Sequence, residues 1–189
     1  MLAKSANTRQ KLMAATIRLV AQGGDGAATI RNIASEVQIT EGAVYRHFRS
    51  KDELCWEAYK RVVVQMAAEK QGLVTSDAPI RDRLREWIWL SFSFYDRNSE
   101  AFTYVLLNPP KMKAKDEDVT KAQGRLFQAM FKQAIHADSV RSLPLDVALC
   151  HFGGLMLNIP RMINEGALAG PATQYVEETA NAVWRVFEP

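Results

Sequence analysis

Side chains that can bind phosphate groups and the edges of nucleic-acid bases are concentrated in one segment near the N-terminus. Residues 29–48 read TIRNIASEVQITEGAVYRHF and include two threonines, two arginines, a tyrosine and a histidine. Hydroxyl, phenol and guanidinium groups donate hydrogen bonds to phosphate oxygens, and an arginine can donate two of them to a guanine. This segment therefore indicates a contact with nucleic acid.

The same side chains are not spaced for catalysis or for metal binding. His47 has no carboxylate, serine or cysteine partner at a motif spacing, and His136 and His151 stand alone in the sequence. The two cysteines, Cys55 and Cys150, are isolated, and we expect them to be reduced. We predict a protein that is not an enzyme and that uses no metal ion and no cofactor.

The charge of the chain is distributed unevenly. The net charge is +3, but residues 1–51 carry eight Lys and Arg against three acidic residues, a net +5. Residues 52–189 carry 16 basic and 18 acidic residues, a net −2. Such asymmetry favours a nucleic-acid or membrane-surface contact at the basic end. Without other support, chance clustering on a solvated face would explain it as well.

The apolar segments do not predict a membrane protein. The most apolar stretch, residues 145–163, is interrupted by charged residues, glycines and a proline. The first residues lack the apolar core of a signal peptide. We therefore expect a cytoplasmic protein without a membrane partner.

The elements that position the phosphate-binding side chains are predicted to be short helices. Thr29 is the expected N-cap of a helix over 30–37, and Thr40 is the expected N-cap of a second helix over about 41–47. A longer amphipathic helix over 7–22 precedes them. Two short helices joined by a tight turn form a helix-turn-helix, whose second helix enters the major groove of DNA.

Side chains of the second short helix would read the bases. Gly42 and Ala43 are small enough for the backbone to approach base edges or a thymine methyl, and Arg46 can reach guanine or phosphate. Thr29 and His47 would position the protein on the phosphates, together with the open helix N-termini. The candidate DNA-binding residues are Thr29, Arg31, Thr40, Glu41, Gly42, Ala43, Tyr45, Arg46, His47 and Lys51.

Helical spacing also dominates the rest of the chain, so the predicted fold class is all-α. Ser50 and Glu53 fit a capping box that starts a helix of about 20 residues, which has no glycine or proline in its interior. Pro160 is predicted either to kink or to split the helix that contains it. About six helices would follow the three N-terminal helices over 7–22, 30–37 and 41–47. They are expected over 51–71, 79–98, 99–107, 117–136, 144–165 and 172–187.

The segment ATIRNIASEVQITEGAVYRHFRSKDEL closely resembles the N-terminal signature of the TetR family of regulators. Its matching positions are Thr29, Ile33-Ala34, Thr40, Gly42, Tyr45-x-His47-Phe48 and Ser50-Lys51-x-x-Leu54. The resemblance implies a DNA-binding domain over 1–50 and a ligand-binding and dimerisation domain over 51–189. It also implies a homodimer that binds a palindromic operator on double-stranded DNA and is released by a small-molecule effector.

One position departs from the family signature. The turn between the two short helices usually has glycine where Gln38 stands, because a left-handed backbone conformation is favoured there. A side chain in that conformation costs about 1–2 kcal/mol. We therefore expect a slightly altered turn, with the helix-turn-helix retained.

Aromatic residues are unusually dense between Trp87 and Tyr104, with seven of them in eighteen positions. Ordinary core packing would explain about half of these positions, but they cannot all face one side of a helix. Some could line a cavity for an apolar or aromatic effector. The candidate ligand-binding residues are Trp87, Phe92, Tyr95, Phe102, Phe127, Phe131, Met156 and Asn158.

The predicted helices 144–165 and 172–187 carry an apolar stripe that includes Leu149, Phe152, Val183 and Trp184, which predicts a dimer interface. Gly153 and Gly154 weaken the first of these helices. They either allow close helix approach across that interface or leave room for a ligand.

Two other functions remain possible from the sequence. The chain could be a DNA-binding protein without a small-molecule effector, such as a nucleoid-associated or protein-controlled factor. It could also be an enzyme of the C-terminal domain, but that alternative requires a nucleophile, a metal cluster or a phosphate loop that the sequence does not contain. An effector-released repressor is the favoured reading.

Overall fold

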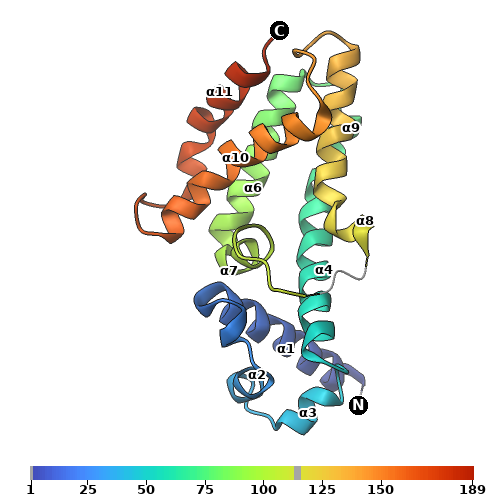
Figure 1. Ribbon diagram of the computed structural model, residues 1–189, viewed down its shortest axis with the longest axis vertical. Helices are drawn as coiled ribbons and strands as arrows, with labels where there is room; N and C mark the ends of the chain where they lie inside the picture. Colours follow the sequence, from blue (N-terminus) through green and yellow to red (C-terminus); the bar gives the residue numbers. More distant parts are fainter. Residues whose placement is uncertain (1, 113–115) are drawn as a thin grey trace. The chain divides into compact units, whose positions relative to one another are not determined.

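The structure is a computed structural model that describes residues 2–112 and 116–189. Its regular structure is helical throughout these residues, with no strand among them, which confirms the all-α prediction (Figure 1). No described helix has both the length and the apolar composition needed to cross a bilayer. The chain divides into two compact units.

The first unit contains Met1–Val63 and Glu100–Thr120. The predicted boundary after residue 50 falls at the first turn of a helix that continues through this unit, and the functional division at that point remains a prediction. The elements of this unit are α1 (Leu2–Gly23), η1 (Asp25–Ala27), α2 (Ile30–Glu36), α3 (Glu41–Tyr45), the start of α4 (Lys51–Lys70), most of α7 (Ser99–Phe102), the π-helical η2 (Thr103–Leu107) and α8 (Glu117–Thr120).

The core of the first unit joins α1, α2 and α3 to the beginning of α4. In Figure 1, α2 lies against α1, and α3 follows it after a sharp turn. Its side chains are apolar and almost wholly buried, as the amphipathic spacing requires. They include Leu12, Val20, Ile33, Val44, Phe48 and Leu54, each at most 1% exposed.

Residues from a distant part of the sequence complete this core. Phe102 and Tyr104 are fully buried in the first unit. The Tyr104 hydroxyl donates a hydrogen bond of 2.9 Å to the carbonyl oxygen of Cys55, and burial raises the pKa of Tyr104. Buried hydroxyl groups need such a partner, because an unmade hydrogen bond in the interior is costly.

The second unit contains Val64–Ser99 and Lys121–Pro189. Its helices α6 and α11 pack closely, and α10 contacts both α9 and α11 (Figure 1). Its elements are the end of α4, α5 (Gly72–Thr75), α6 (Ile80–Arg97), α9 (Ala122–His136), α10 (Leu145–Asn164), η3 (Ala172–Tyr175) and α11 (Val176–Phe187).

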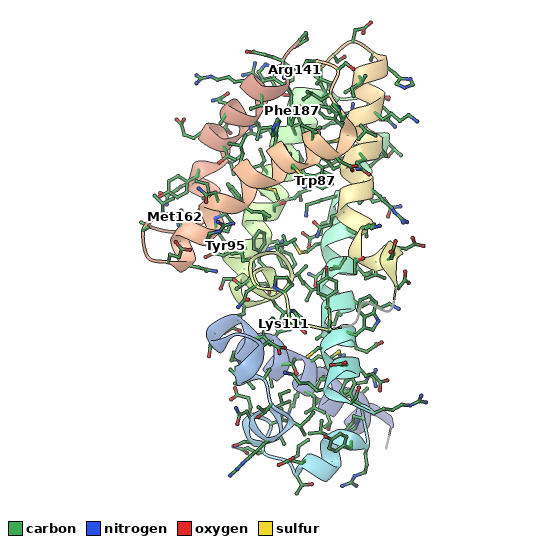
Figure 2. The ribbon with its side chains drawn as sticks, in the orientation of Figure 1. Trp87, Tyr95, Lys111, Arg141, Met162 and Phe187 are labelled. Carbon is green, nitrogen blue, oxygen red and sulfur yellow. The ribbon has the colours of Figure 1, made fainter. Side chains whose placement is uncertain are left out.

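An aromatic cluster fills the core of the second unit. Phe127 lies at its centre, with ring centroids 4.7 Å from Phe152, 5.5 Å from Phe131 and 6.0 Å from Trp87. Phe187 contacts Phe131 at 4.8 Å. Figure 2 labels Trp87 and Phe187 on the ribbons of this unit, and both side chains are buried. Together these rings bury a large apolar area and favour edge-to-face or offset geometry.

Three predicted helices are each divided in the structure. The segment 99–107 forms α7 and then η2, the segment 117–136 forms α8 and α9, and the segment 172–187 begins as the 3-10 helix η3. Pro160 does not split its helix, since α10 runs through it from Leu145 to Asn164. Apolar periodicity marks which side of a segment is buried, but it does not show where the hydrogen-bonding pattern changes.

The turn between α2 and α3 is not altered by Gln38, so that expectation was wrong. Gln38 adopts the left-handed conformation itself, with φ of 59°. The Ile39 N–H bonds to Ala34 O at 3.0 Å and the Gln38 N–H bonds to Ser35 O at 3.0 Å. These two bonds form a Schellman motif, which satisfies the free carbonyl groups at the end of α2.

We predict that Gln38→Gly stabilises the protein, because glycine adopts this conformation without a steric penalty. Glycine relieves the steric strain at this turn but also has more conformational entropy in the unfolded chain. The net effect should raise the free energy of unfolding by about 0.5–1 kcal/mol. Chemical denaturation of the two proteins measures the difference. Gln38→Val is the matched comparison and should be destabilising, and equal stability of the three proteins would contradict the strain at this turn.

Candidate nucleic-acid interface

Three hydroxyl side chains cap three helix N-termini in the first unit. Thr29 Oγ1 accepts a hydrogen bond of 3.1 Å from the Asn32 N–H, and Thr40 Oγ1 accepts one of 3.2 Å from the Ala43 N–H. Ser50 Oγ accepts from the Glu53 N–H at 3.1 Å. These contacts confirm the predicted caps. Each cap uses one of the free N–H groups of its helix, and the first-turn N–H groups that remain can bind an anion such as phosphate.

The capping box at α4 differs in one detail from the usual pattern. Glu53 Oε2 accepts a hydrogen bond of 2.6 Å from the N–H of Arg49, one residue before the cap. The carboxylate therefore fixes the connection between α3 and α4 as well as the first turn of α4. This contact keeps Arg49 at the helix junction while its side chain stays exposed.

The short helix α3 buries one face and exposes the other. Val44 is buried, and Phe48 is buried just beyond the helix. On the other face Tyr45 is 53% exposed, and Gly42 has open space where a side chain would begin. Of the other predicted contact residues, Thr29, Arg31, Thr40, Glu41 and Arg46 are exposed, whereas Ala43, His47 and Lys51 are half-buried.

The cations of the first unit fall into two groups. In the part of the chain that the structure describes, the side chains of Arg31, Arg46 and Arg49 are exposed and make no ion pair or hydrogen bond. Lys51 instead donates a hydrogen bond of 2.9 Å to the carbonyl oxygen of Asp25, and its ammonium lies 3.3 Å from the Asp25 carboxylate. Lys51 thus holds η1 against the start of α4. Its predicted phosphate contact would depend on the ammonium donor that remains.

Arg9 of α1 supports the end of α3, and the sequence motif did not reveal it. Its Nη1 donates a hydrogen bond of 2.8 Å to the carbonyl oxygen of His47, and its guanidinium lies 4.2 Å from the centre of the Phe48 ring. A second nitrogen lies 3.5 Å from the Glu57 carboxylate. A cation at a helix C-terminus is favourable, and Arg9 adds a stacking contact to the charge interaction.

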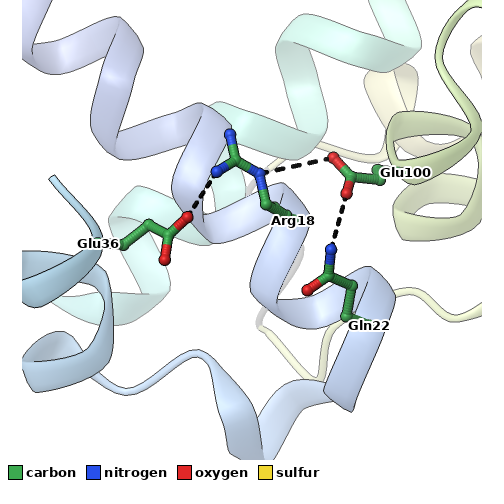
Figure 3. Close-up of polar contacts among 4 residues, drawn as sticks. All are labelled: Arg18, Gln22, Glu36 and Glu100. Atoms are coloured by element: carbon green, nitrogen blue, oxygen red, sulfur yellow. Dashed lines mark hydrogen bonds and ion pairs between the residues drawn. The ribbon is translucent and has the colours of Figure 1, made fainter.

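Arg18 joins three segments of the first unit (Figure 3). Its Nη1 donates to Glu36 at the end of α2 at 2.5 Å, and its Nε lies 3.8 Å from Glu100 of α7. The same Glu100 carboxylate accepts a hydrogen bond of 3.0 Å from Gln22. Arg18 therefore contributes to the basic charge of the sequence, but its guanidinium is engaged inside the unit.

Comparison with known proteins identifies this unit. Residues 12–58 match the family model TetR_N, which is described as bacterial regulatory proteins of the tetR family. The match runs from the middle of α1 to the first turns of α4, and it includes the whole helix-turn-helix of α2 and α3. The N-terminal segment of the chain is therefore similar to the DNA-binding segment of TetR-family regulators.

Relatives and solved structures extend the similarity beyond this segment. The chain is 27% identical over 135 residues to YerO, an uncharacterized HTH-type transcriptional regulator of Bacillus subtilis, covering 70% of this chain and 43% of YerO. It is 27% identical over 149 residues to the HTH-type transcriptional repressor KstR2 of Mycobacterium tuberculosis, covering 76% and 74% of the two chains.

A solved structure of the regulator FadR from Bacillus subtilis, in complex with stearoyl-CoA, has a TM-score of 0.79 with this chain. It is 13% identical, and the match covers 92% of this chain and 96% of FadR. At this identity the similarity supports the fold. The chain spans less than half the length of YerO, the first of these relatives.

Most of the predicted ligand-binding residues lie in the second unit. Trp87, Phe127 and Phe131 belong to its aromatic cluster, and Phe92 and Met156 are also buried there. Their burial fits both core packing and ligand binding, and the ligand-binding role stays a prediction.

The other predicted ligand-binding residues differ in their surroundings. The Tyr95 hydroxyl donates a hydrogen bond of 2.6 Å to Asn164, and Asn158 is exposed on α10. Phe102 belongs to the first unit. Trp89, close to Trp87 in sequence, is 45% exposed, so the dense aromatic segment faces both inward and outward.

The two groups of cations predict different effects of substitution. Lys51→Gln should lower the free energy of unfolding by about 0.5–1 kcal/mol, because it removes a half-buried ion pair and a hydrogen bond. Arg46→Gln and Arg49→Gln should change stability by less than about 0.5 kcal/mol and weaken DNA binding instead. Thermal melts and titrations with a duplex selected from a random library measure the two effects. Equal loss of stability in all three variants would contradict this division.

Proposed function

We propose that the chain is a homodimeric repressor that binds a specific operator and is released from it by a small-molecule effector. The observation that carries the proposal is the exposed face of α3, flanked by three capped helix N-termini and by free arginine side chains. A short helix with one buried face and one open face, beside cations, suits insertion into a major groove. The protein would bind its operator in the cytoplasm, where a bacterial chromosome lies.

In this proposal the residues of α3 read the bases. Glu41, Gly42, Ala43 and Arg46 would face base edges, because they lie on or next to the open side of the helix. The remaining candidates would position the backbone of the DNA through phosphate contacts. These are Thr29, Arg31, Thr40, Tyr45, His47 and Lys51.

The second unit would bind the effector. KstR2, which is similar in sequence, is named a repressor. FadR, which is similar in fold, was solved in complex with stearoyl-CoA. The proposed contacts in this chain are Trp87, Phe92, Tyr95, Phe127, Phe131 and Met156, since Asn158 is exposed on the outer face of α10. They supply a largely apolar surface of the kind that binds small organic ligands.

The dimer interface would use a different set of α10 residues from the one expected. Phe152 and Val183 are 2% and 0% exposed within a single subunit, so they belong to its own core. The outer face of α10 is instead formed by Val147, Cys150, His151, Gly154 and Asn158, all exposed. Beyond its chain neighbours and the backbone of its own helix, no described atom lies within 4 Å of a Cβ placed on Gly154, and this leaves room for a partner helix.

Operator binding should depend strongly on salt. If each subunit neutralises three phosphates, through residues such as Arg31, Arg49 and Lys51, the dimer engages about six, and the slope of log affinity against log salt should be about −5. Titrations of a selected duplex at several salt concentrations measure this slope. A slope near zero would exclude α3 and its neighbours as the DNA-binding surface.

Gly154→Arg should dissociate the dimer and leave the subunit folded. The arginine would project from the outer face of α10, where the subunit has open space, into the partner. Sedimentation at about micromolar concentration should then show a monomer with a helical circular dichroism spectrum and weak operator binding. Gly72→Arg is the matched control, since Gly72 is also exposed with no atom within 4 Å. A stable dimer in Gly154→Arg would place the interface elsewhere.

The alternative is a DNA-binding protein of the same family without a small-molecule effector. The two functions differ in one measurement, which is operator affinity in the presence of a library of small organic compounds. Release by any compound that also raises the melting temperature of the free protein supports the effector-released repressor. Salt-dependent operator binding that no compound changes supports the alternative.

A further inference from the structure

Lys70, the last residue of α4, carries a buried ammonium group that has no ion-pair partner within 4.0 Å among the described residues. The side chain is 0% exposed. Within residues 2–112 and 116–189 it forms no ion pair, and its one hydrogen bond is a donation of 3.3 Å to the carbonyl oxygen of Met66. The neighbouring carboxylate of Glu69 is directed to Arg97, at 3.5 Å. Lys70 thus has one weak acceptor for three N–H donors.

A buried charge of this kind is costly to the fold. Burial lowers the pKa of Lys70 from its ordinary value of 10.5 to about 8, so the group remains mostly protonated at neutral pH. An ionised group in the interior is ordinarily paired or neutralised, because no other interaction offsets the free-energy cost of removing its charge from water. A methionine would fill the same space without this cost.

The surroundings of Lys70 are aromatic. Its Nζ lies 5.7 Å from the centre of the Trp87 ring, and Trp87 contacts Phe127 and Phe152 edge to face, both at 6.0 Å. A ring face attracts a cation but leaves its hydrogen-bonding capacity unused. The position therefore combines a free positive charge with an apolar wall.

A second buried cation lies one helical turn before Trp87 on α6. Arg83 is 9% exposed, and its Nε has no hydrogen-bond partner among the described residues. Its Nη1 donates to the carbonyl oxygen of Leu73 and to Gln133, each at a long 3.3 Å. Arg83 and Leu73 line a hollow of about 410 Å³, whose other charged lining residues are Asp82, Arg85 and Glu86. Residues at positions i and i+4 of a helix share a face, so Arg83 and Trp87 are neighbours along α6.

We infer that the effector is an amphipathic organic anion, such as a carboxylic acid with an apolar chain, whose acid group binds Lys70 and Arg83. Its apolar chain would lie against the aromatic cluster of the second unit. The inference rests on the proposed effector-binding function and specifies the chemistry of the effector. A carboxylate offers the acceptors that both cations lack, and charge-assisted hydrogen bonds of this kind are strong in an apolar site.

The test compares an acid with an uncharged molecule of the same chain length. Dodecanoate and dodecan-1-ol, both below the concentrations at which they form micelles, are titrated into DNA-free protein, with tryptophan fluorescence and melting temperature as readouts. We expect dodecanoate to bind about tenfold or more tightly than the alcohol, the ratio that one charge-assisted hydrogen bond provides. Equal affinities would overturn the inference.

Substitution of Lys70 separates ligand binding from a structural role. Lys70→Met should lose the preference for dodecanoate, keep its affinity for dodecan-1-ol, and raise the melting temperature without ligand by about 3 °C or more, since it removes an uncompensated buried charge. Lys132→Met, at an exposed position of α9, should change none of these. Unaltered dodecanoate binding in Lys70→Met would overturn the inference.

Two further variants keep the test decisive. Lys70→Arg retains the charge and should retain the preference for the acid, and Arg83→Gln should reduce that preference even if Lys70→Met does not fold. Operator titrations are run separately on each variant. If wild type binds operator but does not prefer the acid, this inference fails and the proposed DNA-binding function stands. If no operator is bound, the proposed function fails while the acid preference is still measured.

Discussion

Helices α2 and α3 are seven and five residues long, and helices of that length do not persist in water by themselves. Their stability must come from the surface on which they dock. Ile33 of α2, Val44 of α3 and Phe48 beyond it are buried in the core shared with α1. Because these side chains are packed, the exposed face of α3 has a defined position. A DNA-recognition helix can therefore be short, since its contacts with α1 and α2 stabilise it.

The capping contacts at α2 and α3 depend on that docking as well. A threonine cap contributes about 1 kcal/mol, which cannot offset the cost of nucleating a helix. It selects where the helix begins and leaves the other first-turn N–H groups available. Arg9 acts at the opposite end, where its bond to the His47 carbonyl and its contact with Phe48 hold the exit of α3 against α1.

The local parts of this arrangement were predictable from the sequence, and the long-range parts were not. Thr29, Thr40 and Ser50 are recognisable as caps because each capping oxygen and the N–H group that donates to it are three residues apart. Arg9 and Arg18 reach partners that are 18 to 82 residues away, and no sequence spacing reveals them. Gln38 shows a third case, in which the chain keeps the left-handed turn and tolerates the strain.

In the second unit, too, the sequence predicted some buried side chains and not others. Apolar periodicity predicted that Trp87, Phe127 and Phe131 would be buried, but it could not show that Lys70 would be buried beside them. A lysine is expected at the surface, particularly at the end of a helix, where its charge is favourable. The end of α4 is covered by other elements of the unit, and only the folded chain shows that.

The completion of the first unit by Phe102, Tyr104 and Glu100 has a practical consequence for protein engineering. A fragment that ended at residue 63 would carry the whole reading surface, yet it would leave an opening where Phe102 and Tyr104 are fully buried. It would also lack the carboxylate that Arg18 and Gln22 share. A chimeric regulator that takes its DNA-binding unit from this chain should therefore include both segments of that unit, Met1–Val63 and Glu100–Thr120, because the unit is discontinuous in sequence.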